Sequence, residues 1–293
     1  MRHLALSIFV CTLFLSATEN DKDKRPTLLE AMTQPKVSFQ SDYLSDANFE
    51  GFDASVKTSK QKIQINNDIF GLSYSRWDFD WTNAQTLPFY KGKTPIESMQ
   101  RIILNANLPV FLNDKWFMLN LLNVNATFED EMSNSYGAGI VSFFSYKVDD
   151  MHAIQMGAFA NYHPTKSLAL PILGYTYRIR ETDGLSLLLG FPRAYVGYHL
   201  TPDLLLNAGM IFSQAVIRLS DSSGIEERGF VEAKDYQSNI GVRYTLNAHF
   251  ELSADILYSF KRDFNIYNHD GHEIDSYSIE PSAGAILKIR YLF

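Results

Sequence analysis

The chain has 293 residues, a formal net charge of −7 at pH 7, 16 tyrosines, 21 phenylalanines and one cysteine. The negative charge argues against a nucleic-acid-binding protein, which needs a basic face. No apolar run beyond the N-terminal segment approaches the length of about 18 residues that marks a helical membrane span. A chain this rich in aromatic residues therefore buries them in a β core or presents them to lipid.

Residues 1–17 predict a cleaved secretory signal peptide, because a short basic segment precedes an apolar core over 4–15 and small residues end at Ala17. An uncleaved N-terminal anchor is the alternative, although that core is shorter than the about 20 residues of a transmembrane helix. Cys11 lies inside the segment to be removed, so no disulfide or thiolate metal site is expected in the mature protein. Residues 18–35 are expected to form a flexible periplasmic N-terminal segment, and 36–293 the main domain.

Alternation of apolar and polar residues with a period of two recurs along 36–293 and predicts β-strands. In 250–261 the apolar set is Phe250, Leu252, Ala254, Ile256, Tyr258 and Phe260, and the polar set is Glu251, Ser253, Asp255, Ser259 and Lys261. Keeping charge off one face is what a bilayer enforces, because a lipid-facing Lys or Arg at mid-membrane costs about 2–4 kcal/mol. We therefore predict an all-β, antiparallel transmembrane β-barrel.

The pattern predicts about twelve strands. They are 55–66, 69–81, 97–109, 115–127, 136–147, 151–162, 170–180, 184–200, 203–218, 234–246, 250–262 and 279–293. This count places loops 82–96 and 128–135 on the same side as the short turns, which conflicts with the usual rule for such barrels. Fourteen strands is the alternative: 184–200 would break at Gly190–Arg193, and 36–45 would add a first strand. Its two short strands fall below the about 9–11 residues that span a bilayer.

The last eleven residues form the clearest strand. Ala283, Ala285, Leu287, Ile289, Tyr291 and Phe293 make one apolar face, while Lys288 and Arg290 lie on the other. This C-terminal strand resembles the assembly signal of Gram-negative outer-membrane β-barrel proteins, with Tyr291 and Phe293 as its aromatic residues. The resemblance implies residence in the bacterial outer membrane, contact with its lipid, and recognition of the last strand by the barrel-assembly machinery. The segment 189–198 is also similar to one in a small porin-like barrel family of unknown function, which implies no catalytic residues.

Charged residues of the polar faces are the candidate functional residues. We expect them to face the lumen, where they line a polar pore or form an ion-pair network that fills a narrow barrel. The candidates are Arg178, Asp235, Arg243, Glu251, Asp255, Lys288 and Arg290. Arg180 and Arg193 extend the basic set. Trp77, Trp81 and Trp116 are expected in the aromatic belts at the membrane interfaces.

Two other chemistries have candidate residues in the sequence. The segment 268–273 carries two histidines and two carboxylates, but a solvated turn around Asp270-Gly271 is favoured over a metal site. A lipid hydrolase would need a serine, a histidine and an orienting polar residue brought together. His152, His163, His199, His249, Ser142 and Ser145 are available, yet no motif joins them.

We therefore expect a non-enzymatic outer-membrane barrel without a cofactor, most simply a passive channel for small polar solutes or ions. The first alternative is a closed structural or adhesion barrel that acts through loops 219–233 and 262–278. An outer-membrane lipid hydrolase is the third hypothesis. No nucleic-acid partner is expected.

Overall fold

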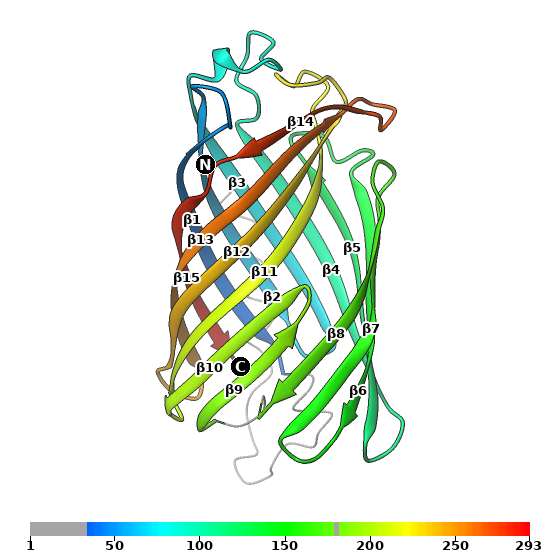
Figure 1. Cartoon of the computed structure of the whole chain (residues 1–293), viewed down its shortest axis with the longest axis vertical. Coiled ribbons are helices and arrows are strands. Elements are labelled where there is room, and N and C mark those ends of the chain that lie inside the picture. Colours follow the sequence, from blue (N-terminus) through cyan, green and yellow to red (C-terminus); the bar gives the residue numbers. More distant parts are fainter. Residues whose placement is uncertain (1–33, 179–181) are drawn as a thin grey trace. The chain divides into compact units, whose positions relative to one another are not determined.

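The computed structural model describes residues 34–178 and 182–293, and shows a closed antiparallel β-barrel (Figure 1). The signal peptide expected at 1–17, most of the segment 18–35, and Arg180 lie outside the described residues. The strands are β1 Lys36–Asn48, β2 Ser55–Asn66, β3 Phe70–Thr82, β4 Ser98–Phe111, β5 Trp116–Phe128, β6 Tyr136–Lys147, β7 His152–Tyr162, β8 Leu168–Tyr177, β9 Gly184–Gly190, β10 Arg193–Thr201, β11 Leu204–Arg218, β12 Phe230–Thr245, β13 Phe250–Tyr267, β14 Glu273–Ile279 and β15 Ser282–Leu292. One short 3-10 helix, η1 (Ala84–Thr86), precedes β4.

Fourteen of the described strands form the wall, so the main prediction of twelve is wrong and the alternative of fourteen is confirmed. The chain breaks between β9 and β10 at Phe191-Pro192, and β1 supplies the added first strand. The remaining strand, β14, continues the line of β15: β13 pairs with β15 through Phe250–Ser259 and with β14 through Arg262–Tyr267. A count of twelve follows only if every strand spans the bilayer, whereas β9 has only 7 residues.

The two rims of the barrel differ in the length of their connections. The barrel closes by pairing of β1 with β15, in which Lys36 lies opposite Leu292. We call the rim that holds these two residues the C-terminal rim and the opposite one the loop rim. The long connections 83–97 and 219–229 and the β13–β14 hairpin all belong to the loop rim, whereas 67–69 and 202–203 are short turns at the C-terminal rim. Long loops on one side and short turns on the other are typical of outer-membrane barrels.

The interior at the loop rim is a packed apolar core rather than an open mouth. We call it the loop-rim cluster, and its buried members are Ala47, Phe49, Ala54, Val56, Leu87, Phe89, Ile96, Met99, Ile217, Leu219, Ile225, Val231, Phe264, Ile266 and Ile279. The ring of Phe49 is 0% exposed and lies 5.7 Å from those of both Trp81 and Phe264. Connections 83–97 and 219–229 supply Leu87, Phe89, Ile96, Leu219 and Ile225, so both connections fold into the barrel.

Two of the three tryptophans belong to this cluster rather than to a membrane belt. Trp77 and Trp81 share the inner face of β3 and pack against the cluster, and Trp81 donates from Nε1 to the carbonyl of Ile96 at 2.7 Å. The expectation of a belt position for these two residues is therefore wrong. The alternation of polar and apolar residues alone does not predict this core position, because the inner face of β3 is polar near the C-terminal rim and apolar near the loop rim. Trp116 lies beside Tyr146 near the C-terminal rim, with 4.8 Å between ring centroids.

A contact between distant strands tightens the loop rim. The end of β11 forms a parallel bridge with the end of β5, between Arg218 and Phe128, although β6 to β10 separate these strands along the wall. The backbone amide of Glu129 donates to the carbonyl of Arg218 at 2.9 Å, and the carboxylate of Glu129 accepts the amide of Ser220 at 2.8 Å. Burial raises the pKa of the Glu129 carboxyl. The barrel is thus pinched where the loop-rim cluster fills it.

No helix in the described part of the chain has the length and apolar character needed to cross a membrane.

Candidate functional site

The two faces of the wall are chemically distinct. On β15, Leu287 and Ile289 are 61% and 49% exposed, whereas Lys288 and Arg290, which alternate with them, lie on the other face. Large exposed apolar side chains follow the same alternation on the neighbouring strands, for example Leu252 and Ile256 on β13. Since successive side chains of a strand point to opposite faces, the charged set lies on the inner side of the barrel.

Four cations of the inner side belong to a single row of paired residues, which we call the cation row. Arg243 of β12 and Lys288 of β15 flank Ser253 of β13. Lys288 and Lys62 of β2 flank Gln40 of β1. Lys62 and Arg101 of β4 flank Ser75 of β3. A cation therefore stands on every second strand, with a neutral side chain between. Neighbouring strands lie about 4.7–4.9 Å apart, which places successive cations about 9–10 Å apart along the backbone.

Carboxylates neutralise only part of this set. The Glu251 carboxylate forms ion pairs with the guanidinium groups of Arg290 at 2.9 Å and Arg243 at 3.6 Å. The Asp42 carboxylate forms an ion pair with Lys60 Nζ at 3.0 Å. Within the part of the chain that the structure describes, Lys62, Lys288 and Arg101 form no ion pair, and the Nε of Arg101 is buried without a hydrogen-bond partner. These three cations of the row therefore have no carboxylate at contact distance, although Asp42 acts on Lys62 and Glu251 acts on Lys288 from farther away.

The remaining predicted carboxylates make neutral contacts. Asp255 accepts the amide of Asn239 at 2.7 Å, and its carboxylate lies against Gly241, where a β-carbon would come within 2.2 Å of Oδ1. Asp235 accepts Ser259 Oγ at 2.5 Å and the amide of Gln237 at 2.6 Å. Both carboxylates lie on the inner face by register, opposite Gly241 and Arg262 respectively.

Arg178 does not lie on a strand. It follows the last residue of β8, has a positive φ of 46°, and binds Asp183 at 2.7 Å within the turn to β9. Together with Gln155 and Thr176 it lines a hollow of about 350 Å³ at the C-terminal rim. The structure thus places Arg178 at the C-terminal rim on the β8–β9 turn, beside the inner-face residues Gln155 and Thr176.

Sequence reasoning missed Lys62 and Arg101, together with the Asp42–Lys60 pair. The signal was present on β2, where Lys60, Lys62 and Gln64 alternate with apolar Ile63 and Ile65. On β4 the signal was weak, because the inner face of that strand mixes Met99 and Ile103 with Arg101. Only the register across seven strands, from β12 to β4, shows that these residues belong to the row that holds Arg243 and Lys288.

The wall opposite the cation row is apolar. Leu121, Val141, Phe159 and Leu170 are successive paired residues of β5, β6, β7 and β8, and the next row holds Leu119, Phe143, Gly157 and Ile172. We call these the apolar rows. A β-carbon on Gly157 would lie 2.1 Å from the backbone oxygen of Ser142 and 2.6 Å from the β-carbon of Phe143, so only glycine fits opposite Phe143. The interior thus has one charged wall and one apolar wall.

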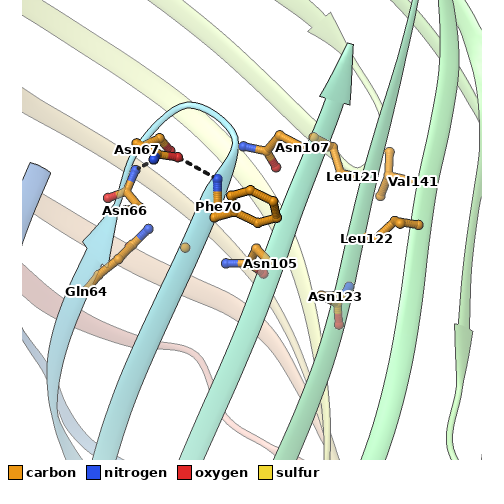
Figure 2. Close-up of a pocket in the computed structure, with 11 residues that line it drawn as sticks. Gln64, Asn66, Asn67, Phe70, Asn105, Asn107, Leu121, Leu122, Asn123 and Val141 are labelled. Atoms are coloured by element: carbon orange, nitrogen blue, oxygen red, sulfur yellow. Dashed lines mark hydrogen bonds between the residues drawn. The ribbon is translucent and has the colours of Figure 1, made fainter. Parts of the chain in front are cut away.

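Carboxamides lie between the two walls. Figure 2 shows Gln64, Asn105, Asn107 and Asn123 around a hollow of about 270 Å³ that Leu121 and Val141 also line. The Asn107 amide donates to the carbonyl of Asp68 at 3.1 Å. Amide groups both donate and accept hydrogen bonds, so this surface suits uncharged polar groups of either kind.

The segment 268–273, which carries two histidines and two carboxylates, is a hydrogen-bonded turn. Asn268 Oδ1 accepts the amides of Asp270 and His272 at 3.0 and 2.9 Å, and Gly271 has a φ of 81°. Within the described residues no group of three potential metal ligands occurs.

The candidate serines and histidines for a hydrolase have separate partners. Ser142 Oγ bonds Asn120 at 2.8 Å, His152 Nδ1 bonds the hydroxyl of Tyr175 at 2.6 Å, and His249 Nδ1 bonds the carbonyl of Leu292 at 2.9 Å. Over residues 34–178 and 182–293 no hydrogen bond links a serine hydroxyl to a histidine ring.

No protein-family model and no curated protein matches this sequence. Among solved structures, a KdgM porin shares 8% identity at a TM-score of 0.40, with 88% of this chain and 99% of that chain covered. The translocator domain of the autotransporter NalP from Neisseria meningitidis shares 11% identity at a TM-score of 0.38, with 99% and 97% covered. A Pseudomonas aeruginosa FadL homologue shares 11% identity at a TM-score of 0.42, with 89% and 90% covered. Likenesses this distant assign no family, substrate or partner.

Proposed function

We propose that this protein is a passive outer-membrane channel that favours small anions. The apolar outer face, the short turns at the C-terminal rim and the long loops at the other rim support a place in the outer membrane, with the C-terminal rim in the periplasm. In this proposal a signal peptide at 1–17 directs export. Tyr291 and Phe293 present the last strand to the barrel-assembly machinery, and outer-membrane lipid surrounds the wall.

The cation row is the observation that carries the proposal. Lys62, Lys288 and Arg101 form no ion pair with any residue that the structure describes. The spacing of about 9–10 Å along the row is close to the screening length of about 8 Å at physiological ionic strength. An anion that moves along this wall is therefore never far from a positive charge. Rings and rows of charged side chains are how pores select the sign of an ion.

The alternative of an adhesion barrel gains no specific support. Leu219 and Ile225 of the loop 219–233 are 0% and 1% exposed within the loop-rim cluster, so much of that loop serves the packing of the barrel. A partner would have only the remaining side chains of that loop and the β13–β14 hairpin to bind.

The test is the reversal potential of the refolded protein in a planar bilayer with a potassium chloride gradient. The wild type is expected to prefer chloride, and the double variant Lys62→Glu/Lys288→Glu to prefer potassium. Lys261→Glu is the matched control, since Lys261 lies on the outer face beside Tyr236. A wild-type protein that migrates as a folded barrel but carries no current, or a double variant with unchanged selectivity, would refute the proposal.

A further inference from the structure

The hydrogen-bonded wall is interrupted above the β9–β10 hairpin. β8 pairs with β9 only through Gly174–Tyr177, and β10 pairs with β11 only as far as Ile211. In the described residues, 168–173 of β8 and 213–217 of β11 have no strand on the sides that face each other. We call this interruption the pairing gap. Figure 1 shows β9 and β10 ending well short of the loop-rim ends of β8 and β11.

The gap has defined borders. On the side of the hairpin, the amide of Phe212 donates to the carbonyl of Pro192 at 3.0 Å. On the side of the loop rim, the Asn161 amide reaches Gln214 at 3.4 Å, and the ring of His163 meets that of Phe230 edge-on at 5.5 Å. The 163–167 turn therefore reaches across from β7 and β8 to the outside of β11 and β12, and it closes the far end of the gap.

The gap begins at the level expected for a membrane interface. Phe191 at the hairpin tip stacks on Phe212 at 5.9 Å, and Tyr236 and Phe260 continue this line of rings at 4.8 and 6.1 Å. Aromatic belts of this kind mark the boundary between acyl chains and headgroups. Unpaired backbone groups are not tolerated against acyl chains. The open edges therefore require water or polar groups, which the headgroup layer provides.

Both apolar rows end at this gap. Leu170 and Ile172 are their last members, and both belong to the unpaired stretch of β8. On the opposite edge, Ile211 projects to the inner side by register and is 42% exposed. The loop-rim cluster closes the direct route along the barrel axis. A solute that leaves the interior toward the loop rim thus meets the gap, with apolar side chains leading up to it.

We propose that the pairing gap is a side opening through which amphipathic anions, molecules with an apolar chain and one negatively charged head, pass between the outer membrane interface and the lumen. The charged head of such a molecule follows the cation row, and its apolar chain follows the apolar rows. This inference rests on the proposed anion channel and specifies the route and the substrate class. Small inorganic anions use the same opening, because the axial route at the loop rim is closed.

The experiment uses the refolded full-length mature chain in liposomes and two probes. Chloride current reports small anions. A pyrene-labelled long-chain alkyl sulfonate, whose permanent charge prevents unassisted flipping, reports amphipathic anions. Ser213→Trp places a bulky ring on an exposed inner-face position at the edge of the gap. It is expected to slow both probes by about tenfold, as a barrier raised by about 1.4 kcal/mol would. Ala208→Trp is the matched control, since Ala208 lies on the outer face of the same strand and is paired on both sides.

A second variant tests the substrate class. Leu170→Asn is expected to slow the sulfonate by about tenfold relative to chloride, because the apolar chain of the sulfonate depends on that side chain. Normal transport of both probes by folded Ser213→Trp would overturn the side opening while the anion channel stands. An unchanged ratio of the two probes in Leu170→Asn would overturn the amphipathic class. A wild type without chloride current would instead remove the proposed function itself.

Discussion

Lys62 and Lys288 flank the same residue, Gln40, in one row of paired neighbours on three adjacent strands. Two ammonium groups therefore lie within two strand spacings of each other, and neither forms an ion pair among the described residues. Neighbouring cations that lack a directly bound carboxylate repel each other and do not stabilise the fold, because each like charge disfavours the charged form of the other. Such an arrangement is expected at a site that acts on a mobile anion.

Single substitutions in the row should separate conduction from folding. Lys288→Gln is expected to reduce the preference for chloride, while the unfolding free energy stays the same or rises, because the substitution relieves repulsion with Lys62. Urea unfolding in lipid vesicles and the reversal potential check the two effects. A clear loss of stability in Lys288→Gln would show that the lysine has a structural role.

Substitution of Glu251, unlike that of Lys288, is expected to lower the unfolding free energy. Its carboxylate holds both Arg243 and Arg290 and its side chain is only 15% exposed, so Glu251→Gln leaves two partly buried cations without their counterion. Removing one partner of such a group costs about 1–3 kcal/mol. Urea unfolding measures the loss, and Glu251→Asp, which keeps the charge, should restore part of it. Equal stability of wild type and Glu251→Gln would contradict this account.

The loop-rim cluster should control access along the axis. Phe49→Ala removes a fully buried ring in contact with Trp81 and Phe264, which costs about 3–5 kcal/mol in a packed core. The channel should then conduct more, with short-lived additional openings in single-channel records. Phe111→Ala is the control, because Phe111 is 69% exposed near the C-terminal rim. Identical conductance in both variants would show that the cluster does not limit the current.

Closure of the barrel should depend on Gly284. A β-carbon there would lie 2.0 Å from the backbone oxygen of Tyr43 on β1, whereas Ala283 on the outer face is exposed. Gly284→Val is expected to block pairing of β15 with β1, seen as loss of the heat-modifiable folded band on a gel. Ala283→Val should fold normally. Normal folding of Gly284→Val would mean that the two strands can separate without cost.

The contact of His163 with Phe230 should depend on pH. Burial lowers the pKa of the His163 ring from 6.5 to about 4, so the folded state favours the neutral ring. The stabilisation is complete above about pH 6.5 and declines as the pH falls toward 4, because the unfolded loop binds the proton more readily. Limited proteolysis within 163–167 should accelerate over that range. His163→Gln should remove this pH dependence, and persistence of the dependence in the variant would assign it to another group.

The period-two pattern by itself determined the barrel class, the two faces of the wall and the inner position of residues such as Lys288 and Arg290. These features are local, because alternation requires only the geometry of a single strand. The place of 36–45 as a strand and the break near Pro192 could also be derived, since turn residues and loop parity are visible in the chain.

Only the tertiary structure decided which charges stand together. The cation row depends on the register of β12, β13, β15, β1, β2, β3 and β4, and a shift of one residue in any pair would send a cation to the lipid face. The core position of Trp77 and Trp81 was likewise decided by the tertiary structure. Their spacing on β3 is that of any inner-face residues, and that face becomes part of a core only because connections 83–97 and 219–229 fold inward. The pairing gap begins where the short β9–β10 hairpin ends, and the break near Pro192 is visible in the chain. The contact of β11 with β5 beyond the gap joins residues far apart in the sequence, and only the tertiary structure shows it.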